Sequence, residues 1–228
     1  MNRTKIEFAV QFNGSNPEGE IKDALKNVGS VEFDRKIGSV VVETENTPWN
    51  VIQSKIEATG RRAVLTGFGG QSCVSIINTG KSALNGVVRI CSVSSENKGS
   101  VIDGVVDGLE AHKKYRFNIH ECGDLSNGCE SVGNVFSQSS VEEKLIEADN
   151  NGRLSFRILD KFLNVSDLIG RSVVISKADD SEERVGCGII ARSAGIFENS
   201  KKICACDGVT IWSERDRPIA GKGRREQK

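Results

Sequence analysis

The hydrophobic pattern of the chain changes at residues 69–71, and this change constrains the fold most strongly. Before it, runs of alternating apolar residues are interleaved with two runs at helical spacing. After it, only short apolar runs continue, separated by Gly, Asn and Asp. A period of two is typical of strands and a period of three to four of helices. We therefore expect a mixed domain at 1–68, a linker at 69–71, an all-β domain at 72–195 and a tail at 196–228.

The first part alternates strand and helix. Ile6, Phe8, Val10 and Phe12 alternate on one face of the first strand, while the second helix is expected to start with Thr47 as its cap and Pro48 at its first position. The predicted strands are 5–12, 30–34, 39–44 and 61–65, and the predicted helices are 18–28 and 47–58. The order βαββαβ is that of a ferredoxin-like α+β domain.

The second part is predicted to consist of strands. The 24 glycines and the low aromatic content of 5% favour turn-rich β structure over helical bundles. The clearest strands are 74–77, 86–90, 100–106, 115–119, 154–157 and 172–175. Their spacing is typical of an antiparallel Greek-key barrel or of a sandwich.

Composition excludes some classes of function. The 31 basic residues balance 31 acidic ones, so no overall field recruits nucleic acid or an anionic membrane. No apolar run is long enough to span a bilayer, and the first residues lack the apolar core of a signal peptide. We therefore expect a cytoplasmic protein, in which seven cysteines serve metal or redox chemistry rather than a disulfide scaffold.

Cys204-Ala205-Cys206 is the strongest chemical feature. Two thiols one residue apart, near the start of a polar tail, suit Cu(I) binding and thiol exchange, because a thiolate is both a soft ligand and a nucleophile. The alternative is two incidental cysteines in a flexible end. The basic residues beyond them, Arg215 among them, are interpreted as solvated charge.

The first part resembles heavy-metal-associated domains of the copper-chaperone type, through residues 8–11 (Phe-Ala-Val-Gln) and 57–65 (Glu-Ala-Thr-Gly-Arg-Arg-Ala-Val-Leu). That family binds its metal between the first strand and the first helix with a Met-x-Cys-x-x-Cys loop. Here residues 12–20 contain no thiol and no histidine, so this loop lacks the ligands for Cu(I). We expect the domain to act as a scaffold or docking module.

The second part resembles Cu/Zn superoxide dismutase. The likeness is carried by residues 85–89, 106–109, 117–124, 128–133, 149–152, 169–172 and 186–190. Where that family has a His-x-His copper motif, this chain has Asn118-Ile119-His120. Where the family has its metal-bridging histidine, this chain has Val135. The chain has only two histidines, His112 and His120, whereas the dismutase site needs several. The resemblance therefore implies the barrel without dismutase activity, with zinc binding doubtful and His120 as a structural residue.

The same resemblance implies further roles. Cys129 and Cys187 match the pair that forms the intrasubunit disulfide of the dismutase, the alternative being two buried free thiols. Cys73 and Cys91 are expected in the core. The positions of the dimer face are Cys122, Gly123, Ile169, Gly170, Ile190 and Arg192, although ordinary core and turn roles would also explain them.

The tail, through Cys-x-Cys-Asp-Gly and residues 211–215 and 217–224, resembles the third domain of copper chaperones for Cu/Zn superoxide dismutase. This resemblance implies a partner that forms a heterodimer with a dismutase subunit, delivers transiently bound Cu(I) and promotes the target's disulfide through Cys204 and Cys206. Three alternatives remain: an active dismutase, which the histidine count opposes, a metal-free dismutase partner, and a general thiol oxidoreductase. A homodimer is also compatible with the sequence.

Overall fold

The computed structural model describes residues 3–81, 84–93, 99–136, 145–179, 183–203 and 208–217. These residues form two compact units. One combines residues 3–71 with Ala194–Arg217, and the other comprises Ser72–Ser193. The first stretch of the tail thus belongs structurally with the N-terminal residues.

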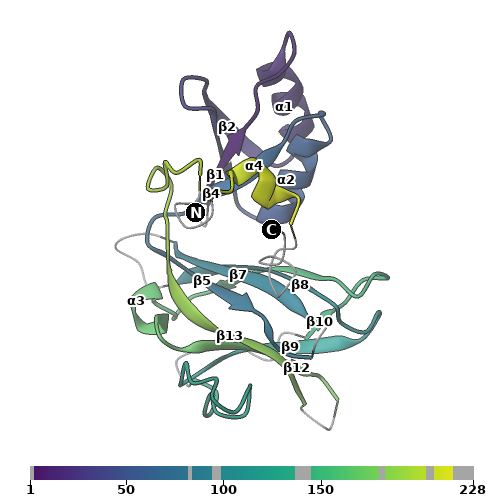
Figure 1. Cartoon of the computed structure of the whole chain (residues 1–228), viewed down its shortest axis with the longest axis vertical. Coiled ribbons are helices and arrows are strands. Elements are labelled where there is room, and N and C mark those ends of the chain that lie inside the picture. Colours follow the sequence, from purple (N-terminus) through teal and green to yellow (C-terminus); the bar gives the residue numbers. More distant parts are fainter. Residues whose placement is uncertain are drawn as a thin grey trace. The chain divides into compact units, whose positions relative to one another are not determined.

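The N-terminal residues fold as a four-stranded antiparallel sheet with two helices (Figure 1). The strand order is β2-β3-β1-β4, which follows from the predicted sequence order βαββαβ and confirms the ferredoxin-like fold. The elements are β1 (Thr4–Val10), α1 (Pro17–Leu25), β2 (Gly29–Asp34), β3 (Ser39–Thr44), α2 (Trp49–Glu57) and β4 (Ala63–Phe68). One further short helix, α4 (Ile211–Arg215), lies in the tail segment of this unit.

The two helix starts differ in how they are capped. At α1 the side chain of Asn16 accepts a hydrogen bond from the backbone N–H of Gly19 at 3.2 Å, and Pro17 begins the helix. At α2 the predicted Thr47 cap is wrong. Pro48 keeps an extended backbone, with ψ of 147°, so it is itself the capping residue and the helix begins at Trp49.

The second unit is an antiparallel sheet that curls around one core (Figure 1). Its strand order is β10-β9-β12-β13-β5-β7-β8-β11, with β6 paired to β13, and β10 and β11 at the two ends of this order contact each other. Non-consecutive neighbours such as β9 and β12 confirm the Greek-key barrel. The elements are β5 (Ser72–Ile77), β6 (Thr79–Gly80), β7 (Asn85–Ser92), β8 (Ser100–Asp107), β9 (Lys114–His120), β10 (Leu145–Glu147), β11 (Leu154–Asp160), α3 (Val165–Leu168), β12 (Ser172–Lys177) and β13 (Arg184–Ser193).

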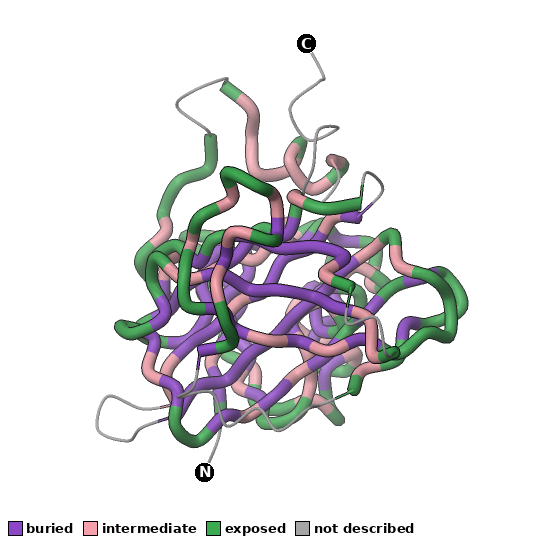
Figure 2. Tube along the Cα trace, turned by 90° about the horizontal axis from the view of Figure 1, so that it is seen from below, coloured by how far each residue is buried: buried purple, intermediate pink, exposed green. Residues whose placement is uncertain are grey.

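The barrel core is built from alternate residues of these strands, and the strands are the most buried parts of the trace in Figure 2. Phe117 of β9 and Phe156 of β11 meet across it, with ring centroids 5.2 Å apart. Phe117 is 1% exposed. Because a cavity at such a site closes only partly, the core depends on this ring.

We expect Phe117→Ala to lower the free energy of unfolding of the barrel by about 3–5 kcal/mol, the usual range for a buried phenylalanine. Phe162→Ala is the matched control, because Phe162 lies in the same unit but is 60% exposed. Urea unfolding followed by far-ultraviolet circular dichroism measures both. Equal losses in the two variants would contradict this account of the core.

Candidate functional site

The two candidate copper ligands, Cys204 and Cys206, lie outside the described residues, but the chain on either side of them is described. Ile203 and Thr210 pair in an antiparallel bridge, and the backbone N–H of Ile211 donates to the carbonyl of Lys202 at 3.0 Å. The two ends of the segment that contains both cysteines are therefore hydrogen-bonded to each other.

Helix α4 begins at Ile211, directly after this bridge, and an ion pair attaches it to α2. The hydroxyl of Thr210 caps it by accepting from the backbone N–H of Ser213 at 3.2 Å. The guanidinium of Arg215 donates twice to the carboxylate of Glu57, through Nε at 2.7 Å and Nη2 at 2.6 Å. A bidentate pair of this kind is among the stronger charged hydrogen bonds. The interpretation of Arg215 as solvated charge is therefore wrong.

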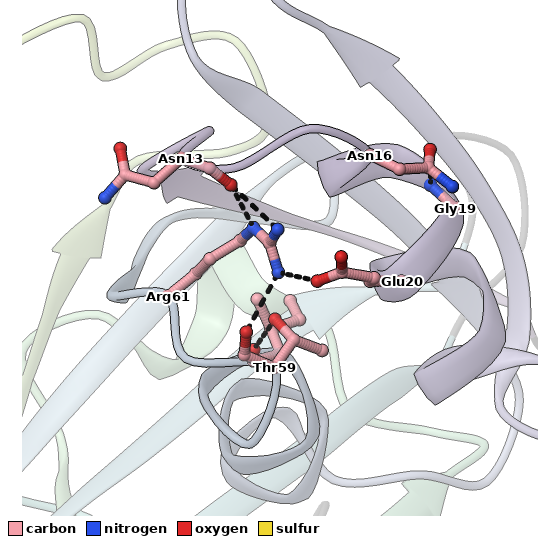
Figure 3. A network of polar contacts seen from close by, with 7 residues as sticks. Asn13, Asn16, Gly19, Glu20, Thr59 and Arg61 are labelled. Atoms are coloured by element: carbon pink, nitrogen blue, oxygen red, sulfur yellow. Dashed lines mark hydrogen bonds and ion pairs between the residues drawn. The ribbon is translucent and has the colours of Figure 1, made fainter.

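The loop at the metal position of the ferredoxin-like fold is held by an arginine (Figure 3). Arg61 donates through Nε and Nη2 to the carbonyl of Asn13, at 3.1 and 2.7 Å. Its Nη1 donates to Glu20 at 2.7 Å and to the carbonyl of Thr59 at 2.9 Å. The Arg61 side chain is 4% exposed, so this cation is almost entirely enclosed by the loop and its surroundings.

This arrangement disfavours metal at the loop for two reasons. The loop has no sulfur or imidazole, and a buried cation lies beneath it. A Cβ placed on Gly14 would stand 3.2 Å from Nη2 of Arg61, which shows how closely the guanidinium approaches the loop backbone. Because like charges repel more strongly where water is excluded, Cu(I) would be unfavourable here.

The two histidines lie at opposite ends of β9. His120 is buried, its Nδ1 lies 3.0 Å from the carbonyl oxygen of Gly133, and its backbone pairs with Val135. His112 lies on the exposed turn before the strand. A strand rises about 3.3 Å per residue, so no single ion contacts both imidazoles. Burial lowers the pKa of His120, and nearby Arg184 lowers it further, while the Gly133 carbonyl partly opposes this.

A disulfide bond joins Cys129 to Cys187, the pair that the resemblance implied, with a Cα–Cα distance of 5.7 Å. It connects the segment after β9 to β13 and packs with Val132 and Val174. Arg184 donates to the carbonyls of Cys129 and Gly133, at 2.8 and 3.2 Å. Arg184 thus supports the segment that carries the disulfide.

The remaining described cysteines differ in exposure. Cys73 and Cys91 are buried, and burial together with the charge of Cys91 raises the pKa of Cys73 to about 12. A thiol held protonated is a poor metal ligand. Cys122 is exposed. Across the described ranges, no three His, Cys, Asp or Glu side chains gather in a way that could hold a metal ion.

The structure brings together some of the predicted dimer-face residues, namely Gly123 and Gly170, next to Ile189. A Cβ on Gly123 would lie 2.3 Å from the Gly170 carbonyl and 3.2 Å from Ile189, so only glycine fits. Ile169 and Ile189 are 46% and 43% exposed. The Ile190 side chain turns into the core at 1% exposure, because neighbouring strand residues face opposite ways. Ile190 contacts the segment that carries Gly170 through its backbone: its carbonyl accepts from the N–H of Gly170 at 2.9 Å, and its N–H donates to the carbonyl of Arg171 at 2.8 Å. Cys122 and Arg192 are exposed.

Sequence reasoning missed the residues that hold the tail. Glu57 and Arg215 lie 158 positions apart, and no motif or periodicity joins them. Only the folded structure brings them together.

Comparison with known proteins agrees with the fold. The family described as copper/zinc superoxide dismutase matches residues 84–195. The human protein named copper chaperone for superoxide dismutase is 39% identical, covering 97% of this chain and 92% of its own length. The Saccharomyces cerevisiae protein named superoxide dismutase 1 copper chaperone is 34% identical, covering 93% of this chain and 94% of its own. A solved structure of the clock protein EA4, 20% identical with a TM-score of 0.44 over 53% of this chain and 93% of that one, is too distant to carry an argument.

A dismutase-type barrel that lacks the histidines for its metals, together with a ferredoxin-like unit and a two-cysteine tail, defines a non-enzymatic relative of the dismutases. The chain belongs to the family of copper chaperones for superoxide dismutase. None of the described helices is both long and apolar enough to cross a lipid bilayer.

Arg61→Ala is expected to lower the unfolding free energy of the first unit by about 1–3 kcal/mol, because it removes a buried guanidinium and leaves the carbonyls of Asn13 and Thr59 without this donor, whereas its partner Glu20 is half exposed. Tryptophan fluorescence in urea reports this, since Trp49 and Trp212 both belong to that unit. Arg35→Ala is the control: its ion pair with Glu18 is largely exposed, so the loss is expected below about 1 kcal/mol. Equal effects would contradict the role of Arg61.

The lowered pKa of His120 makes barrel stability depend on pH. Between its folded pKa and the ordinary value of about 6.5, the unfolded chain binds more protons, so stability is lost as pH falls through this window. Urea unfolding at pH 7 and at lower pH should show this slope. His120→Gln should flatten the slope, and His112→Gln should keep it. A slope unchanged by His120→Gln would contradict the assignment.

Proposed function

We propose that this protein docks on a Cu/Zn superoxide dismutase subunit through its barrel, delivers Cu(I) from Cys204 and Cys206, and promotes the target's intrasubunit disulfide. The observation that supports the proposal is a dismutase-type barrel in a chain that has only two histidines. The histidines available at the expected positions are too few for catalysis, yet Gly123 and Gly170 still meet beneath exposed Ile169 and Ile189. Family membership supports the same function.

The exposed face supports docking by shape and chemistry. Ile169 and Ile189 offer apolar surface around a flat glycine contact, which suits a partner barrel with a similar face. A heterodimer with the dismutase and a homodimer of this protein would use the same face and therefore compete. Docking brings the tail to the target, which is what delivery requires.

Copper is the cargo in this proposal. The thiolates of Cys204 and Cys206 hold Cu(I), a soft ion that favours two sulfur ligands. Transfer is an exchange of ligands, in which imidazoles of the target replace the thiolates and no electron moves. The protein is thus a metallochaperone in the cytoplasm, where thiols stay reduced, and zinc has no assigned site in it.

The disulfide step balances as thiol–disulfide exchange. A target thiolate attacks the Cys204–Cys206 disulfide, one tail sulfur leaves as a thiolate, and a mixed disulfide forms. The second target thiolate then displaces the remaining tail sulfur, so the target gains the disulfide and the tail is reduced. Once Cu(I) has left, dioxygen takes two electrons and two protons from the two tail thiols, which forms the tail disulfide and hydrogen peroxide. Ring strain in a Cys-x-Cys bond makes it a good oxidant.

We expect the Cys204→Ser/Cys206→Ser double variant to lose stoichiometric Cu(I) binding and activation of copper-free dismutase. Anaerobic Cu(I) titration and dismutase activity after mixing measure the two effects. Cys122→Ser is the matched control, because it removes an exposed thiol outside the tail and should leave Cu(I) stoichiometry unchanged.

The alternative is a dismutase partner that acts without metal. It predicts that the double variant still stabilises or activates the target when copper is supplied separately. Undiminished activation by the double variant without added copper would overturn the chaperone proposal. A general thiol oxidoreductase would instead oxidise unrelated dithiol proteins equally well.

A further inference from the structure

The chain that leaves the barrel is attached to the ferredoxin-like sheet before it reaches the cysteines. The backbone N–H of Phe68 donates to the carbonyl of Ala194 at 3.3 Å, and Ile196 donates to Gly69 at 2.8 Å. The backbone N–H of Phe197 donates to the carboxylate of Glu7 at 2.8 Å. Residues 194–197 are therefore joined to β1 and to the end of β4.

Glu7 makes this attachment strong. Its residue is 5% exposed, and its other carboxylate oxygen accepts from the hydroxyl of Ser39 at 2.9 Å. A buried carboxylate needs donors, and the Phe197 N–H supplies one of them. Releasing the tail would leave that oxygen without this partner, so the attachment is coupled to the stability of the sheet.

A second attachment lies beyond the cysteines. Arg215 forms its bidentate pair with Glu57 at the end of α2. Arg62 adds an ion pair to Asp216 at 3.0 Å and donates to the carbonyl of Trp212 at 3.0 Å. Glu57 and Arg215 are 24% and 39% exposed, so this pair is only partly screened by water.

We propose that the ferredoxin-like unit positions the copper-carrying segment, through a tail anchor made of Glu7, Glu57, Arg62, Phe68 and Gly69. The anchor holds the chain on both sides of Cys204 and Cys206, at residues 194–197 and 212–216. This inference rests on the proposed function, because it assigns these residues a role in delivery. It also gives the unit a task that needs no metal loop.

We expect the two attachments to reduce the conformational freedom of the segment between them. Cys204 is covalently next to Ile203, whose bridge to Thr210 closes the segment. The two ends of the segment that contains the cysteines are thus held together, and a chain whose ends are fixed has fewer conformations to lose when it engages a partner. Without the anchor the segment would lose more conformational entropy on engaging the target, so transfer would be slower.

The test removes the charged part of the anchor and leaves the cysteines intact. In Arg215→Ala we expect Trp212, on α4, to become more accessible to acrylamide, while buried Trp49 contributes little quenching. The Cu(I)-loaded variant should activate copper-free, reduced dismutase about tenfold more slowly, because its thiols lose their fixed stems. Its Cu(I) stoichiometry should not change.

Two further variants separate positioning from general stability. Arg153→Ala removes a bidentate pair of the same kind, with Asp107, from the barrel unit, and should change neither quenching nor activation. The reversed pair, Glu57→Arg with Arg215→Glu, should restore both. Rescue by reversal is expected only if the pair itself holds the helix.

Failure of the inference differs from failure of the proposed function. Activation at the unaltered rate by Arg215→Ala, or unchanged quenching of its Trp212, would overturn the tail anchor while leaving copper delivery intact. Absence of Cu(I) binding or activation by the unaltered protein would instead overturn the proposed function. The quenching experiment still tests the attachment in that case.

Discussion

Strand β13 (Arg184–Ser193) is the element on which most of the structure depends, because it pairs with β12, β5 and β6. Side chains on the two faces of this strand have different roles. Ile190 enters the core, whereas Cys187 and Ile189 face the other side, where one forms the disulfide and the other is exposed. The same strand then leads the chain into the tail. The buried Ile190, the disulfide and the exposed Ile189 thus all depend on the backbone pairing of one strand.

The barrel has a dismutase-type fold although the chain has only two histidines. Apolar burial and strand pairing hold the wall, and neither needs a metal. His120 sits in the wall beside the Gly133 carbonyl, and Arg184 fastens the disulfide segment. The ferredoxin-like unit is similar, since Arg61 secures by hydrogen bonds a loop that carries no ligand. In both units these polar groups support the backbone geometry.

Much of this could be predicted from sequence, for identifiable reasons. Period-two runs such as Ile6, Phe8 and Val10 gave the strands, and the order of elements gave the ferredoxin-like sheet. The helix α2 begins one residue later than predicted, because proline fixes only φ, here −60°, which suits both a helical and an extended residue, and the extended ψ of 147° has no sequence signal. The disulfide partners and the partner face came only from family resemblance. The Glu57–Arg215 pair could not be predicted from the sequence, because it joins residues 158 positions apart and no local pattern indicates it.

We infer that Cu(I) passes directly from the tail thiols to a docked dismutase. The most direct measurement loads this protein with Cu(I), mixes it with zinc-loaded, reduced, copper-free dismutase, and quantifies copper in the re-isolated dismutase with and without an excess of a Cu(I) chelator. Direct transfer predicts the same copper content in both cases, because the ion never enters solution. Loss of copper from the dismutase when the chelator is present would contradict the claim and indicate release into solution instead.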